Sequence, residues 1–119
     1  MRYWGKADAK VGGYHLLQHH SLDVAACAGA LLKANGRFRQ TLTGMTGLAE
    51  AELVPLIEWA AALHDLGKFS PAFQWLAPNV AGQLGQSATT LKYDVQHAHL
   101  GWALWHQVLR DGDVPKSAP

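Results

Sequence analysis

The chain has 119 residues, of which 49% are apolar and 16% charged, and its net charge is +1. This length corresponds to about one domain, and the near-neutral charge gives no case from composition for nucleic-acid binding. The apolar excess, with five tryptophans, indicates surface that packs against more chain or against a partner.

The single cysteine, Cys27, excludes an internal disulfide, and we expect it to be a buried thiol in a reducing cytoplasm. No apolar run approaches the ~20 residues of a membrane span, so we expect no membrane partner.

Nearly all of the chain has a helical pattern. Residues 1–14 carry glycines without a clear period, and we interpret them as a lead-in segment. A helix is predicted at 15–35, where Asn-Gly is a stop signal, followed by a short helix at 37–42 and a glycine-bounded turn with the sequence GMTG. A further helix is predicted at 49–64.

The second half of the chain is predicted to contain shorter elements. Ser70 and Pro71 can open a short helix through Trp75, with serine as the cap and proline in the first position. The following stretch, 77–94, is rich in Gly, Pro, Ser and Thr and is predicted to be a loop, and a last helix is predicted at 95–109. We therefore predict an all-α fold with a helical core at 15–109 and a frayed tail at 110–119.

Three predicted helices each place one histidine on their apolar stripe, namely His20, His64 and His97. The full stripes are Leu16, His20, Val24, Cys27 and Leu31; Leu53, Leu56, Ile57, Ala60 and His64; and His97, Gly101, Leu104 and Val108. Three helices are thus expected to direct an imidazole toward a common interior.

Two interpretations of these histidines remain open at this point. A lone histidine on an apolar face is usually a core residue that is hydrogen-bonded to a backbone carbonyl. Three such residues, one followed directly by Asp65, would be costly to bury without partners, and a divalent metal would supply a partner for all of them. Imidazole suits Zn, Fe, Ni, Co or Mn, carboxylate oxygen favours harder ions, and Asp65 is oriented to bridge two ions.

Three stretches carry a resemblance to a known family: HHSLDVAACAGALL, AALHDLGKFSPAFQ and QHAHLGWALW. In this order, and together with the opening YWGK, they resemble the HD nuclease domain of the CRISPR-associated helicase–nuclease of type I interference systems. A His-Asp pair alone is a weak sign of the HD superfamily, whereas GKFSPAFQ combined with HSLDVA is much more specific. The resemblance implies an HD-domain helical bundle.

The resemblance also implies a role for individual residues. The metal ligands would be His20 rather than His19, the pair His64 and Asp65, and His97, with Asp65 shared between two ions. Lys68 matches the family's active-site lysine, so Asp65 and Lys68 are the expected catalytic residues. The remaining histidines have no expected ligand role, although His99 is kept as a secondary candidate; they are His15, His19, His99 and His106.

The implied function is metal-dependent hydrolysis of single-stranded DNA in CRISPR type I interference, an antiviral defence. The candidate ions are Mn, Ni, Co, Fe and Mg, and the expected location is the cytoplasm. The implied partners are single-stranded DNA, a helicase domain in the same full-length protein, and an RNA-guided surveillance complex.

The sequence departs from the family pattern after His97. The family continues with a tandem histidine pair and a late aspartate, but no such pair follows here, and no phosphate-binding loop is present. We therefore expect residues 1–119 to form a partial HD nuclease domain with an incomplete two-ion site and weak or no activity. The alternatives are an inactive binding or regulatory module that retains the nuclease surface, and a nucleotide phosphohydrolase of the HD superfamily, which leaves GKFSPAFQ unexplained. The apolar excess also leaves a homodimer open.

Overall fold

The computed structural model describes residues 2–8 and 10–109, and it divides into two compact units. We call Gln18–His64 the helical unit, and Met1–Leu17 together with Asp65–Pro119 the mixed unit. The described residues contain six α-helices, two short helical segments of other types and one two-stranded sheet. The predicted, mostly helical fold is confirmed. No helix within the described ranges is both long and apolar enough to cross a membrane.

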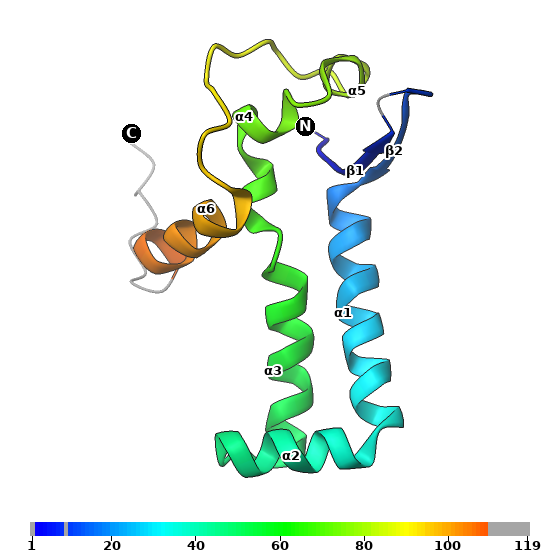
Figure 1. Ribbon diagram of the computed structural model, residues 1–119, viewed down its shortest axis with the longest axis vertical. Helices are drawn as coiled ribbons and strands as arrows, with labels where there is room; N and C mark the ends of the chain where they lie inside the picture. Colours follow the sequence, from blue (N-terminus) through cyan, green and yellow to red (C-terminus); the bar gives the residue numbers. More distant parts are fainter. Residues whose placement is uncertain (1, 9, 110–119) are drawn as a thin grey trace, which may run out of the picture. The chain divides into compact units, whose positions relative to one another are not determined.

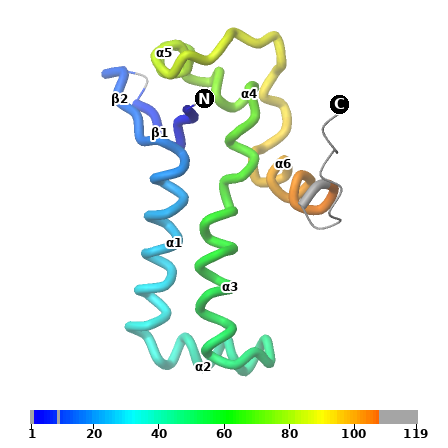
Figure 2. The backbone as a smooth tube through the Cα atoms, turned by 180° about the vertical axis from the view of Figure 1, so that it is seen from behind, coloured from blue at the N-terminus to red at the C-terminus, as the bar shows by residue number. Residues whose placement is uncertain are grey.

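The helical unit consists of α1 (Leu17–Ala34), α2 (Gly36–Thr46) and α3 (Glu50–Leu63). In Figures 1 and 2, α1 and α3 run side by side, and α2 crosses one end of the pair. The Asn35 side chain caps α2 by accepting a hydrogen bond from the amide of Phe38 at 3.0 Å. The prediction of a turn at GMTG was wrong, because α2 continues to Thr46 and ends only at Gly47, which has φ 72°.

The buried face of the helical unit differs from the predicted stripes. In α1, Leu17 and Leu32 are buried in place of Leu16 and Leu31 of the predicted stripe, while His20 stays on the buried side. Leu53 of α3 is 1% exposed, on the stripe as predicted. A Cβ at Gly29 would overlap the Glu58 carboxylate, so α1 and α3 come close at this position. Several predicted stripe residues are exposed instead, namely Cys27, Leu31, Leu56, Ala60 and Leu104, and the side chain of Val108 lies outside the described ones. The prediction of a buried thiol was therefore wrong.

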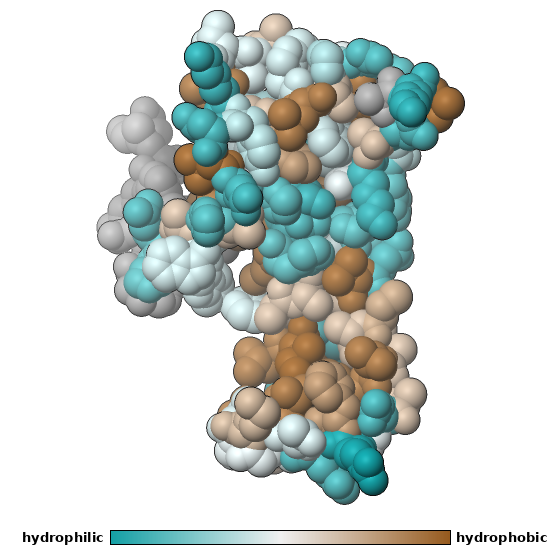
Figure 3. Space-filling view, in the orientation of Figure 1, coloured by the Kyte–Doolittle hydropathy of each residue, from teal (hydrophilic) through white to brown (hydrophobic). Residues whose placement is uncertain are grey.

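Large apolar side chains are exposed on both units. Figure 3 shows apolar residues gathered over the lower half of the helical unit. The large side chains that are 42–78% exposed in this unit are Leu22, Leu31, Phe38, Met45, Leu56 and Trp59. A surface of this kind is typical of a region that packs against more protein.

The mixed unit begins with an antiparallel hairpin, β1 (Trp4–Asp8) and β2 (Gly13–Leu16), which was not predicted. Trp4 pairs with Leu16 and Lys6 with His15, so the ladder has an irregularity at Gly5. The Asp8 carboxylate accepts a hydrogen bond from the Lys10 amide at 2.9 Å and so closes the turn. The first 14 residues therefore have a defined structure rather than serving only as a lead-in.

The rest of the mixed unit consists of η1 (Leu66–Phe69), α4 (Pro71–Gln74), α5 (Pro78–Gln83), α6 (His97–Leu104) and η2 (Trp105–Leu109). The helix predicted at Ser70 is confirmed, since its hydroxyl accepts a hydrogen bond from the Phe73 amide at 3.2 Å. Helix α5 contradicts the predicted loop at 77–94, because Pro78 occupies a first-turn position where it favours a helix. The last helix begins at His97, two residues later than predicted, and the predicted tail at 110–119 lies outside the described residues.

Gln74 joins the hairpin to the motif GKFSPAFQ. This side chain is fully buried, and its amide oxygen accepts a hydrogen bond from the Trp4 amide at 2.9 Å. Its amide nitrogen donates to the carbonyl oxygens of Trp4 and Lys68, both at 2.8 Å. The apolar core beside it contains Trp4, Phe73, Ala77, Val80 and Leu84. Strand β1 is therefore attached directly to the segment that carries Lys68.

Candidate metal centre

The helical unit places two imidazoles close together. His20 lies near the start of α1 and is 9% exposed, while His64 caps the end of α3. Their ring centroids are 5.8 Å apart with an interplanar angle of 62°. His64 Nδ1 lies 2.6 Å from the Ala61 carbonyl oxygen, which can only accept, so Nδ1 donates and Nε2 keeps a lone pair. His64 is thus oriented to offer Nε2 as a ligand.

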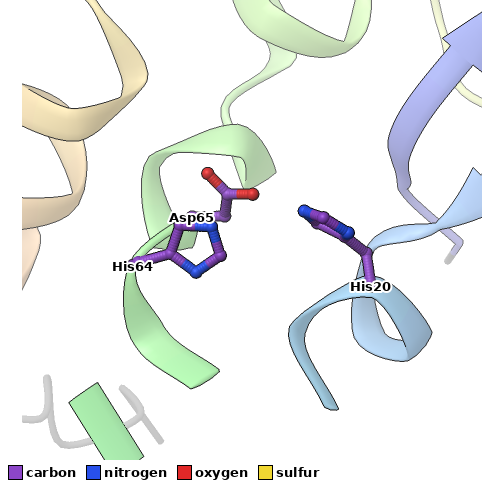
Figure 4. Close-up of side chains that lie close together, drawn as sticks. All are labelled: His20, His64 and Asp65. Atoms are coloured by element: carbon purple, nitrogen blue, oxygen red, sulfur yellow. The ribbon is translucent and has the colours of Figure 1, made fainter. Parts of the chain in front are cut away.

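Asp65 follows His64 directly and begins the mixed unit. One ligand atom from each of His20, His64 and Asp65 lies within 4.8 Å of the other two, and Figure 4 shows these three side chains. Imidazole nitrogen and carboxylate oxygen are both common ligands of divalent ions, so this group could hold one. The residues therefore fit a divalent metal ion.

In the mixed unit, two further candidate site residues, Lys68 and His97, lie close to the Asp65 carboxylate. Asp65 is 3% exposed, and its Oδ2 lies 2.7 Å from Lys68 Nζ. Its Oδ1 lies 3.4 Å from Nε2 of His97. A buried carboxylate requires such partners, because its desolvation is otherwise very costly. The mixed unit thus brings Asp65, Lys68 and His97 together.

Two glycines explain how His97 comes so close to Asp65. A Cβ on Gly67 would overlap the His97 carbonyl oxygen, and a Cβ on Gly101 would lie 3.0 Å from the Gly67 nitrogen. The backbones of η1 and α6 therefore touch where neither has a side chain. Gly67 is the glycine of the HDLGK motif, so the motif includes the contact that positions α6.

Lys68 is held from two directions. Its Nζ donates to the Gly5 carbonyl oxygen at 3.2 Å, at the irregularity of the hairpin, and it lies 5.6 Å from the centroid of the Phe73 ring. Its backbone carbonyl accepts the hydrogen bond from Gln74. The sequence analysis missed this role of the hairpin, although Gln74 stands in the quoted motif.

The histidines without an expected ligand role lie elsewhere. His99 is on an exposed face of α6, and the ring of His106 stacks on Trp102 with centroids 4.6 Å apart. The sequence analysis also missed Tyr93, whose hydroxyl oxygen lies 2.9 Å from His97 Nδ1. Its position in a predicted loop gave no helical phase from which this contact could be inferred.

The family model for the HD domain of Cas3 matches residues 4–118. The chain belongs to the Cas3 HD-domain family. It is also 34% identical over 76 residues to the CRISPR-associated endonuclease/helicase Cas3 of Escherichia coli (strain K12), a match that covers 61% of this chain and 9% of that protein. No solved structure matches it.

Membership of the Cas3 HD-domain family confirms the predicted resemblance. The chain is therefore an HD domain of the Cas3 type, of a class whose chemistry depends on metal. It spans about a tenth of the length of the relative that it matches.

Proposed function

We propose that this Cas3 HD domain hydrolyses phosphodiester bonds of single-stranded DNA with divalent metal held by His20, His64, Asp65 and His97. The observation that carries the proposal is the grouping of ligand atoms from His20, His64 and Asp65 within 4.8 Å. The name of the Escherichia coli relative joins an endonuclease to a helicase, and a helicase produces the single strands that such a nuclease would cut.

Asp65 is the central residue of the proposed chemistry. Its buried carboxylate has one oxygen toward His97 and one toward Lys68, so it can hold ligands or ions on two sides. A bound divalent ion would lower the pKa of a coordinated water and neutralise charge on the scissile phosphate. Lys68 Nζ, already 2.7 Å from Asp65, is suited to pair with a phosphate oxygen or a developing oxyanion.

The wider setting of the proposal follows the family. We propose Mn, Ni, Co, Fe or Mg as the ion, a helicase domain in the same polypeptide and an RNA-guided surveillance complex as partners, and antiviral defence in the cytoplasm as the role. The proposed ligands would give three protein ligands to one ion and two to a second, with Asp65 counted twice, so we expect the second ion to bind weakly. The exposed apolar side chains of the helical unit support contact with further protein, including a second copy.

The first test is titration of the purified chain with Mn²⁺, Ni²⁺ and Co²⁺ by calorimetry, followed by cleavage assays on single-stranded DNA. We expect Asp65→Asn to abolish metal binding and cleavage, whereas Asp94→Asn, the same chemical change at an exposed position, leaves both unchanged. Metal binding that survives Asp65→Asn would refute the ligand assignment. Loss of metal in His64→Ala with DNA or partner binding retained would instead favour the inactive binding module.

A further inference from the structure

Tyr93 makes two contacts with His97 that the proposed function does not use. Its hydroxyl oxygen accepts a hydrogen bond from the His97 backbone amide at 2.9 Å, which caps the start of α6. The same oxygen lies 2.9 Å from Nδ1 of the His97 ring. Both rings pack against Phe73, with centroid distances of 5.6 Å for Tyr93 and 5.2 Å for His97. All of these residues belong to the mixed unit.

The hydrogen-bonding capacity of the phenol limits how the His97 ring is arranged. A tyrosine hydroxyl can accept two hydrogen bonds and donate one. The backbone amide of His97 takes one acceptor position. The ring contact is then either Nδ1–H donating to the second acceptor position, or the phenol O–H donating to Nδ1. In the first arrangement Nε2 has a lone pair, and in the second it carries the proton.

Nε2 of His97 lies 3.4 Å from Asp65 Oδ1. A cation bound between these two atoms would favour the first arrangement, in which Nε2 has a lone pair. Without a cation, a nitrogen lone pair that faces a carboxylate oxygen is unfavourable. With a divalent cation, the nitrogen and the oxygen can both act as ligands. His64 shows the arrangement in which Nδ1 donates a hydrogen bond and Nε2 has the lone pair, since its Nδ1 donates to the Ala61 carbonyl oxygen. For His97 the corresponding partner is a side chain, so it can be removed by substitution.

We propose that Tyr93 is a positioning residue for His97. Its phenol oxygen accepts a hydrogen bond from Nδ1–H, so that Nε2 presents its lone pair beside Asp65 Oδ1 to a divalent cation. This inference rests on the proposed function, in which His97 is a metal ligand. Partners that hold the second nitrogen of a ligating histidine fix its tautomer and ring orientation, and their loss typically weakens metal affinity 10–100-fold.

The test compares the affinity of three variants for Mn²⁺ by calorimetry. Tyr93→Phe retains the ring that packs on Phe73 and removes only the hydroxyl, and we expect its Kd to rise about 10–100-fold. Tyr14→Phe makes the same change on an exposed tyrosine of the hairpin and should leave the Kd unchanged. His97→Ala measures the full contribution of the ligand.

The outcomes separate this inference from the proposed function. A weakened His97→Ala beside an unaffected Tyr93→Phe would overturn the role of Tyr93 and leave His97 as a ligand. An unaffected His97→Ala would overturn the ligand assignment, and the inference with it.

A spectroscopic measurement on the unsubstituted protein covers the case in which Tyr93→Phe does not fold. With ¹⁵N-labelled histidine and Zn²⁺ as a diamagnetic probe, we expect the His97 resonances to show a protonated Nδ1 and a metal-bound Nε2. A metal-bound Nδ1, or an Nε2 that remains protonated when Zn²⁺ is bound, would overturn the proposal.

Discussion

At the scale of single residues, the candidate site depends on charges that compensate one another. Lys68 and Asp65 are both largely buried, with side chains 13% and 4% exposed and 2.7 Å between Nζ and Oδ2. In the metal-free protein, Lys68 supplies the positive charge that makes burial of Asp65 tolerable. A metal ion would also supply positive charge at this carboxylate. Bound metal should therefore replace part of the contribution of Lys68 to the free energy of unfolding.

This predicts that Lys68→Met destabilises the metal-free protein by up to about 3 kcal/mol, because it leaves a buried carboxylate without its cation. Urea denaturation measures the loss, and saturating Mn²⁺ should recover part of it. Lys33→Met is the matched control: its pair with Glu58 is 3.4 Å long with side chains 68% and 34% exposed. An exposed pair of this kind contributes about 0–1 kcal/mol. Equal losses in the two variants would contradict the argument.

Cys27 provides a second prediction at this scale. The structure places its thiol on the exposed side of α1, although the predicted stripe placed it inside. We therefore expect the native chain to react with one equivalent of a thiol reagent such as dithionitrobenzoate at the rate of an accessible cysteine. Reaction only after addition of denaturant would show that the thiol is buried.

At the scale of elements, the contact of η1 with α6 decides where His97 stands. Gly67→Ala would force a Cβ into the His97 carbonyl oxygen, and backbone cannot move aside as a flexible side chain can. We expect the variant to be less stable by about 1–3 kcal/mol, as for overpacking in a core. It should also bind Mn²⁺ more weakly, because α6 is displaced. Thermal unfolding and calorimetry measure the two effects.

Gly82→Ala is the control for this prediction. A Cβ at Gly82, within α5, has no neighbouring atom within 4 Å. Alanine is also the better helix former, so this variant should be at least as stable as the parent chain. A Gly67→Ala variant that behaves like Gly82→Ala would show that η1 and α6 do not need their close approach.

The secondary-structure elements differ in how well they could be predicted from the sequence. Helices with strong local signals were predicted: Asn35-Gly36 indicated the end of the helix before it, and Ser70 indicated the cap of the helix after it. The hairpin was missed because its pairing depends on Gln74, which is 70 positions from Trp4 in the sequence. The buried leucines of α1 are Leu17 and Leu32 rather than Leu16 and Leu31, because apolar periodicity alone does not tell which of two adjacent leucines is buried.

Some residues of the candidate site could be predicted from the sequence and others could not. His20, His64, Asp65 and Lys68 could be selected from phase and motif, because those signals are local. Their supporting residues could not, because Gly5 and Tyr93 contribute a carbonyl and a hydroxyl through contacts that no sequence period encodes.

At the scale of the whole molecule, the proposed ligands come from both compact units. His20 and His64 belong to the helical unit, and Asp65 and His97 to the mixed unit. The peptide bond between His64 and Asp65 is one of the two places where the chain passes from one unit to the other. In the proposed assignment His20, His64 and Asp65 bind one ion, and Asp65 and His97 bind a second, so loss of metal is expected to lower the stability of each unit that supplies a ligand.

We predict that metal stabilises each unit that supplies a ligand. At a free Mn²⁺ concentration of 100 times Kd, binding should contribute about 2.7 kcal/mol to the free energy of unfolding. Hydrogen exchange followed by mass spectrometry should show slower exchange in α1 and in α6, because opening either helix would release a ligand. His97→Ala should remove the protection of α6 and leave most of that of α1, whose ligand His20 is assigned to the first ion. Protection confined to the helical unit would mean that His97 binds no ion, and the second ion of the proposal would have to be abandoned.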